Sequence, residues 1–92
     1  MTTIHMDIDA MRGVQNDLEK LRGSIERIVQ STNGVVSGLP QHWRSQSADQ
    51  FYAEYYESMG EISGILGRLS EITSALGSEI SSYERIAEEL SD

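Results

Sequence analysis

The chain has 92 residues, a formal net charge of -8 and no Cys. This length predicts one domain over residues 1–92, and the absence of Cys excludes a disulfide framework and thiolate metal sites. The acidic balance argues against nucleic acid and an anionic membrane surface as partners, and no apolar run is long enough to predict membrane insertion. With 38% hydrophobic residues the chain has enough apolar surface for helix faces but little for a self-sufficient globule, so we expect it to oligomerise.

Apolar residues in the first half recur every seven positions and predict a helix over residues 8–37. Asp7 or Asp9 can cap the start of this helix. Its apolar stripe is typical of a helix packed along one seam. One row consists of Ile4, Met11, Leu18, Ile25, Thr32 and Leu39, and the adjacent row of Val14, Leu21, Ile28 and Val35.

A turn is predicted over residues 38–46. Pro40 lacks an amide donor and disfavours helix at the residue before it, so the first helix should end near Gly38. Trp43, the single Trp of the chain, falls inside this turn. A large aromatic there either plugs the open end of a helix pair or is offered to a partner.

A second helix is predicted over residues 46–88. Ser45, or Ser47 with Gln50 three residues later, can cap its start. Its apolar face is broader than a two-stranded coiled-coil seam and suits a helical bundle. The central row consists of Ala48, Tyr55, Ile62, Leu69, Leu76, Tyr83 and Leu90; the flanking rows are Phe51, Ile65, Ile72, Ile86 on one side and Tyr52, Met59, Leu66, Ile80, Ala87 on the other.

Polar residues and glycines interrupt the second helix. Ser58, Thr73 and Glu79 break the flanking rows. Gly60 and Gly64 either admit a neighbouring helix or are simply tolerated, and Gly77 could end the ordered part. Because the second helix is the longer, residues after about Glu79 should run past the start of the first helix.

A helix pair of this kind should bury apolar residues from both helices between them or against a dimer partner. The residues expected in this hairpin or dimer core are Leu18, Leu21, Ile25, Ile28, Phe51, Tyr55, Ile62, Leu66, Leu69 and Leu76.

Catalytic, metal and cofactor chemistry has little support in the sequence. Neither His5 nor His42 has a partner at nucleophile or metal spacing, so we expect no enzyme activity, metal or cofactor. His5, Asp7 and Asp9 alternate and could bind a cation weakly, although a solvated helix cap is the simpler interpretation.

Negative charge is concentrated in the second half of the chain. Residues 46–92 hold ten acidic side chains against two basic ones, Arg68 and Arg85. Glu54, Glu57 and Glu61 lie along one helical stripe, either as a solvated face or as a docking surface for a basic partner. Stacking two such helices adds like charge, which mildly favours a less acidic partner.

The predicted turn carries Trp43-Arg44-Ser45, followed by the small Ala48 and the aromatic Phe51. With two amphipathic helices around this turn, nearly the whole chain resembles the WXG family, the small Esx-type proteins of type VII secretion systems. Ser45 stands where the family motif has Gly. The resemblance implies that Trp43, Arg44 and Ser45 form the turn half of an export signal recognised by the secretion ATPase.

The second family element is a Tyr followed four residues later by an acid. Here Tyr83 is followed at that distance by Ala87, with Glu88 one residue further on. That extra residue rotates Glu88 by about 140° beyond a full turn from Tyr83. The resemblance assigns the tail half of the signal to Tyr83 and Glu88; either this signal is degenerate, or a partner's tail serves for export.

The resemblance also implies an all-α fold, an antiparallel helix-turn-helix hairpin that dimerises into a four-helix bundle with each Trp turn near the C-terminal segment of the other subunit. The partner would be a second copy or a related WXG-like chain, and the protein would be non-enzymatic and exported from the cytoplasm. The N-terminus shows no Sec-type signal pattern. Two alternatives are a heterodimeric chaperone or targeting factor for a toxin's helical N-terminal domain, and a structural coiled-coil protein in which Trp43 is merely a plug.

Overall fold

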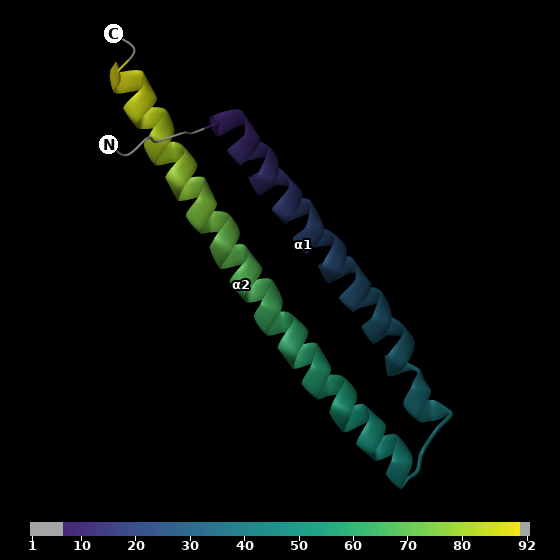
Figure 1. Cartoon of the computed structure of the whole chain (residues 1–92). Coiled ribbons are helices and arrows are strands. Elements are labelled where there is room, and N and C mark those ends of the chain that lie inside the picture. Colours follow the sequence, from purple (N-terminus) through teal and green to yellow (C-terminus); the bar gives the residue numbers. More distant parts are fainter. Residues whose placement is uncertain (1–6, 91–92) are drawn as a thin grey trace.

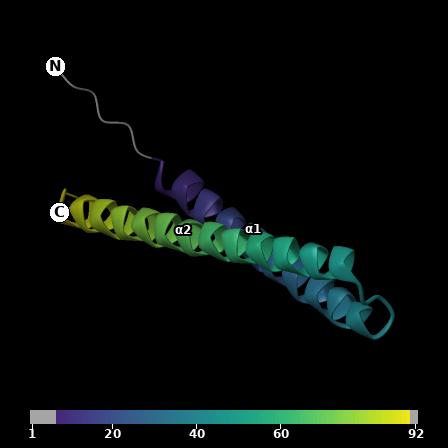
Figure 2. The same ribbon diagram turned by 90° about the horizontal axis from the view of Figure 1, so that it is seen from below.

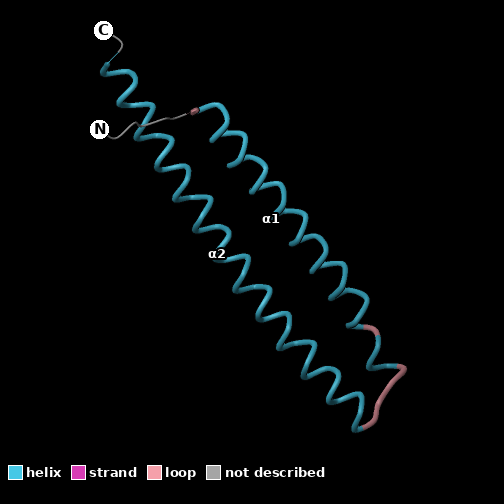
Figure 3. Tube along the Cα trace, viewed as in Figure 1, coloured by secondary structure: helices cyan, strands magenta, loops and turns pink. Residues whose placement is uncertain are grey.

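The computed structural model describes residues 7–90 as two long helices joined by a short turn (Figure 1). Helix α1 spans Ile8–Ser37 and helix α2 spans Gln46–Leu90, with a single 3-10 turn, η1, at Leu39–Gln41 between them. Figure 3 shows that non-helical backbone is confined almost entirely to the connection. No strand occurs within residues 7–90, so the predicted all-helical hairpin is confirmed.

Local sequence signals account for the start of α1 and for its end. The Asp7 carboxylate accepts a hydrogen bond from the Ala10 N–H at 3.0 Å, so Asp7, and not Asp9, is the N-cap. At the other end Gly38 has φ -84°, a right-handed conformation, and Pro40 lies within the 3-10 turn that follows. Ile4 and His5 lie outside the described residues, and with them part of the proposed cation site.

The two helices are antiparallel and cross at an angle (Figures 1 and 2), so they contact along one seam. Only Ala48, Thr73 and Ile80 are fully buried among residues 7–90. The other seam residues are half-buried, as expected for a rod with extents of 71 × 24 × 15 Å. A single layer of contacts therefore holds the hairpin together.

Seven of the ten expected core residues are half-buried in this hairpin, namely Leu18, Ile25, Tyr55, Ile62, Leu66, Leu69 and Leu76. The other three are exposed: Leu21 by 57%, Ile28 by 64% and Phe51 by 39%. These three do not belong to the core of the hairpin. They lie on rows rotated away from the seam, because a two-helix contact covers a narrower strip than the full apolar stripe.

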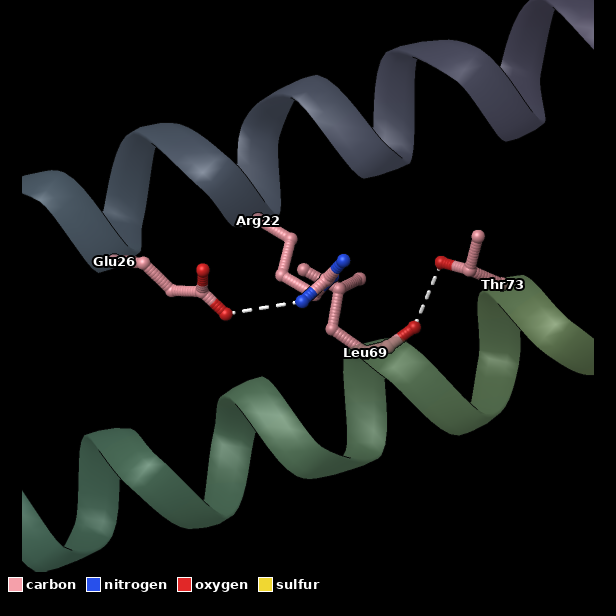
Figure 4. A network of polar contacts seen from close by, with 4 residues as sticks. All are labelled: Arg22, Glu26, Leu69 and Thr73. Atoms are coloured by element: carbon pink, nitrogen blue, oxygen red, sulfur yellow. Dashed lines mark hydrogen bonds and ion pairs between the residues drawn. The ribbon is translucent and has the colours of Figure 1, made fainter.

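Thr73 was expected to weaken the apolar pattern, but it lies on the seam and is 5% exposed. Its hydroxyl donates to the Leu69 carbonyl at 2.8 Å, which satisfies the polar atom within its own helix (Figure 4). The same view shows Arg22 of α1 donating to Glu26 at 2.9 Å. Both polar groups are therefore paired within their own helices, and the burial of Thr73 leaves no unsatisfied hydroxyl.

The glycines of α2 differ in what surrounds them. Gly77 does not end the helix; the amide of Gln15 lies over it, and a Cβ there would come within 2.6 Å of Gln15 Nε2. Around Gly60 and Gly64 a Cβ would meet nothing within 4 Å, so within the hairpin neither admits a neighbouring helix. Of these three glycines, Gly77 is the one that lies against a side chain of α1.

The overhang of α2 is shorter than expected. Arg12, in the second turn of α1, forms an ion pair with Glu84, and Ile80 is only 2% exposed, so contact extends well beyond Glu79. The expectation assumed that both helices begin level at the turn. Instead, Tyr55, nine residues into α2, donates a hydrogen bond to Asn33, four residues before the end of α1, so α2 begins roughly five residues beyond the end of α1.

Candidate functional site

The Trp43 turn is held by hydrogen bonds to its backbone. The Trp43 N–H donates to the Leu39 carbonyl at 3.0 Å, and the Trp43 carbonyl accepts from the Tyr52 hydroxyl at 2.9 Å. Arg44 Nε donates to the Pro40 carbonyl at 2.9 Å. The turn is thus a defined structure in which the Arg44 side chain folds back on the loop.

The Trp43 ring packs against aromatic residues at the start of α2. Its centroid lies 5.5 Å from Phe51 and 6.0 Å from Tyr52, and the cluster continues through a stacked Phe51–Tyr55 pair at 6.4 Å. Nevertheless Trp43 remains 36% exposed. The two interpretations of this residue are therefore compatible: one side of the ring packs on α2, and another is accessible to a partner.

Ser45 caps α2. Its Oγ accepts from the Ala48 N–H at 3.0 Å and its carbonyl accepts from the Asp49 N–H at 3.0 Å, whereas Ser47 lies inside the helix. No residue within 7–90 has a positive φ, so this turn does not require glycine at position 45. A serine supplies the small side chain of the motif and a cap that glycine lacks.

A second candidate surface is the exposed apolar face, which consists of Val14, Leu21, Ile28 and Val35 on α1 with Phe51, Ile65, Ile72 and Ile86 on α2. Exposure ranges from 52% to 79% on α1 and from 39% to 60% on α2. Each row is rotated about 80° round its helix from the rows that face the seam, in the same sense on both helices. Because the helices are antiparallel, these equal rotations place both rows on one face of the hairpin.

The structure does not bring the two halves of the expected export signal together within one chain. Trp43, Arg44 and Ser45 lie at the turn, whereas Tyr83 and Glu88 lie near the other end of α2, roughly 55 Å away at 1.5 Å per residue. Tyr83 is half-buried and Glu88 is exposed.

Within residues 7–90 no group of three His, Asp or Glu side chains could hold a metal ion, and His42 is exposed in the turn. Neither helix of this part of the chain is long and apolar enough to cross a bilayer. Glu54, Glu57 and Glu61 are exposed, as a solvated acidic stripe would be.

The sequence predicted the Trp43 turn and gave Ser45 and Ser47 as alternative caps of α2, of which Ser45 is the cap. It did not predict Tyr52 as the hydrogen-bond donor to the Trp43 carbonyl. Tyr52 was counted only as an apolar residue. The nine-residue separation between the two carries no periodic signal, because it depends on how the turn folds back on α2.

A family model described as proteins of 100 residues with WXG matches residues 3–88. Comparison with curated proteins and comparison with solved structures give no match.

Proposed function

Since this chain belongs to the WXG100 family, we propose that it is exported by a type VII secretion system as one member of a helical pair, or serves as the export partner of another substrate. The family consists of non-enzymatic helical proteins linked to secretion, whose members typically pair with one another. The observation that carries the proposal is the Trp43 turn, where the Trp-Arg-Ser motif is held in a defined loop with the ring partly exposed.

Pairing is supported by the exposed apolar face. Monomeric soluble proteins rarely leave long contiguous apolar rows uncovered, and this hairpin has two such rows on one face. Covering them with a second hairpin gives a four-helix bundle, which supplies the core that a single seam lacks. The partner is an identical or a related WXG hairpin.

In this proposal the secretion ATPase recognises Trp43, Arg44 and Ser45 from one chain together with Tyr83 and Glu88 from a tail. Because the two halves are far apart within a hairpin, an antiparallel pair would join the turn of one chain to the tail of the other. The protein would be made in the cytoplasm and act outside it.

Two other functions remain as alternatives. A dedicated chaperone or targeting factor would pair with the helical N-terminal domain of a toxin and would need that partner to become fully helical. A structural coiled-coil protein would use Trp43 only as a plug and would not be exported.

Replacing Trp43 with Ala separates these functions in a bacterium that carries this chain and its secretion apparatus. The export proposal predicts normal helicity by circular dichroism and normal pairing, but loss of the protein from the culture medium. Tyr56→Ala is the matched control, because Tyr56 is another aromatic residue, lies in the first half of α2 outside the turn, and is 64% exposed.

A plug role predicts a different result, namely loss of about 3 kcal/mol or more of stability in Trp43→Ala. Undiminished export of a folded Trp43→Ala protein would contradict the recognition role.

A further inference from the structure

The end of α1 contains an Asn-Gly pair, Asn33-Gly34, shortly before the helix ends at Ser37. In such a pair the backbone nitrogen of the glycine can attack the side-chain carbonyl carbon of the asparagine and close a succinimide ring, because glycine has no Cβ to obstruct the approach. We propose that Asn33 is a self-modification site, which deamidates when the end of α1 opens and is protected while the hairpin is closed. The reaction requires neither a partner nor export, so it is independent of the proposed function.

The reaction balances with water alone. The Gly34 nitrogen forms a bond to Asn33 Cγ and loses its proton, while the bond from Cγ to Nδ2 breaks and ammonia leaves. Water then opens the succinimide at one of its two carbonyl carbons. Attack at Cγ gives aspartate, and attack at the backbone carbonyl carbon gives isoaspartate, in which the main chain continues through Cγ. No oxidant or reductant is consumed.

The closed hairpin keeps the reacting atoms of Asn33 and Gly34 apart. Within α1 the Gly34 N–H donates to the carbonyl four residues earlier, that of Gln30. The helical backbone at Asn33, with ψ of about -42°, also differs from the conformation that the planar ring requires. The Asn33 side chain is restrained as well, because its Oδ1 accepts a hydrogen bond from the Tyr55 hydroxyl of α2. Tyr55 is thus a positioning residue that ties the reactive amide to the other helix.

This end of α1 is also a place where the helix opens at low cost. Gly34 is a poor helix former, and a Cβ there would meet nothing within 4 Å in the part of the chain that the structure describes. The Thr32 hydroxyl donates to the Ile28 carbonyl at 2.7 Å, an arrangement that bends or weakens helices. Opening needs only the last turns of α1 and the Tyr55 contact to give way, so its free energy lies below that of global unfolding.

The site lies away from the exposed apolar face. Asn33 is exposed, and about 200° of helix rotation separates it from Val35, the residue of that face nearest to it in sequence. A partner bound to the apolar face would therefore leave Asn33 accessible to water, which the hydrolysis of the ring consumes.

Deamidation changes the hairpin in one direction. Either product adds a negative charge close to the last turn of α1, where the helix dipole favours positive charge. Isoaspartate also inserts an extra carbon into the backbone, so the regular hydrogen-bond pattern of the helix cannot continue through this position. A chain that has opened and reacted therefore does not close again as it was, and the modified residue records the opening.

The first test follows deamidation of the purified full chain at neutral pH, in buffer and in urea, by ion-exchange chromatography and by peptide mapping with mass spectrometry. The rate at Asn33 should be at least about tenfold higher in urea, where the helix no longer protects it. Asn16 is the matched control, because it is the other asparagine of the chain, is also exposed on α1, and is followed by Asp17 instead of glycine.

Three outcomes of this test would overturn the proposal. Equal rates at Asn33 in buffer and in urea would show that the fold does not protect the site. An unreactive Asn33 in urea would show that it is not a site, and equal rates at Asn33 and Asn16 in urea would remove the role of Gly34.

The second test uses substitutions around the amide. Tyr55→Phe should raise the rate in buffer about two- to tenfold by removing one hydrogen bond, and should leave the rate in urea unchanged. Tyr56→Phe, at the neighbouring tyrosine that is 64% exposed, should change neither rate. Gly34→Ala should slow the reaction in urea, where the fold plays no part.

These substitutions can contradict each role separately. An unchanged or slower reaction of Tyr55→Phe in buffer would mean that the hydroxyl does not restrain the amide, and would overturn the positioning role. An undiminished rate of Gly34→Ala in urea would overturn the attack by the backbone nitrogen at that position.

The third test concerns the consequence for the hairpin. The isoaspartate-containing chain, separated after reaction in urea and returned to buffer, should show less helix by circular dichroism and a lower melting temperature than the untreated chain. Asn33→Asp is the matched control, because it carries the added charge without the extra backbone carbon, and it should lose less. Recovery of the full melting temperature by the isoaspartate-containing chain would overturn the one-way change.

Discussion

Replacing Ser45 with Ala removes the cap of α2. The Ser45 Oγ accepts from the Ala48 N–H at 3.0 Å, and Ala48 is fully buried at 0% exposure, so water cannot readily take the place of the lost oxygen. Loss of an N-cap costs about 0.5–2 kcal/mol, and the burial of the donor puts this site near 2 kcal/mol. For a domain of this size the melting temperature should fall by about 8–16 °C.

Two further variants separate the cap from other causes. Ser45→Gly restores the usual motif and should cost only a few tenths of a kcal/mol, because glycine leaves room for solvent at the first amides of the helix. Ser47→Ala, at the other predicted cap, should change stability by less than about 0.5 kcal/mol.

The measurement is thermal and urea unfolding followed by circular dichroism, with all variants at one protein concentration because pairing adds to apparent stability. If Ser47→Ala destabilises as much as Ser45→Ala, or if Ser45→Ala has no effect, the assignment of Ser45 as the cap is wrong.

Three further substitutions probe other contacts by the same unfolding measurements. Gly64→Ala should stabilise the chain by up to about 1 kcal/mol, because a Cβ there meets nothing within 4 Å and alanine favours helix; destabilisation would reveal a neighbour at that position. Gly77→Ala should gain less, since its Cβ would come within 2.6 Å of Gln15 Nε2 and the amide must move aside; an equal gain would mean that this contact is loose. Tyr52→Phe should cost about 1 kcal/mol by removing the hydrogen bond to the Trp43 carbonyl, and an unchanged midpoint would show that the turn does not depend on it.

The helices could be predicted from the sequence because their signals are local. Pro40 and Gly38 mark the turn, Asp7 and Ser45 are capping residues, and heptad rows of apolar residues continue through both helices. These features depend on residues within one or two turns of each other, so they can be recognised in the sequence without knowledge of tertiary contacts.

What could not be predicted depends on the placement of one helix against the other. The heptad rows predicted Leu21, Ile28 and Phe51 as core residues alongside Leu18 and Leu69. Periodicity identifies an apolar stripe but does not show which part of that stripe a neighbouring helix covers. Likewise, the short overhang of α2 depends on how far it begins beyond the end of α1. The hydrogen bond from Tyr52 to Trp43 is also a product of that geometry.

A hairpin held by one layer of contacts has a mechanical consequence. Ile8 and Leu90 lie at the same end of the rod, and the turn at the other (Figure 1). Force applied between these ends would separate the helices pair by pair from Arg12 and Glu84 toward the turn, and would not have to break all seam contacts at once. A motor pulling on the end of α2 would meet a series of small barriers, the last of them at the aromatic cluster around Trp43.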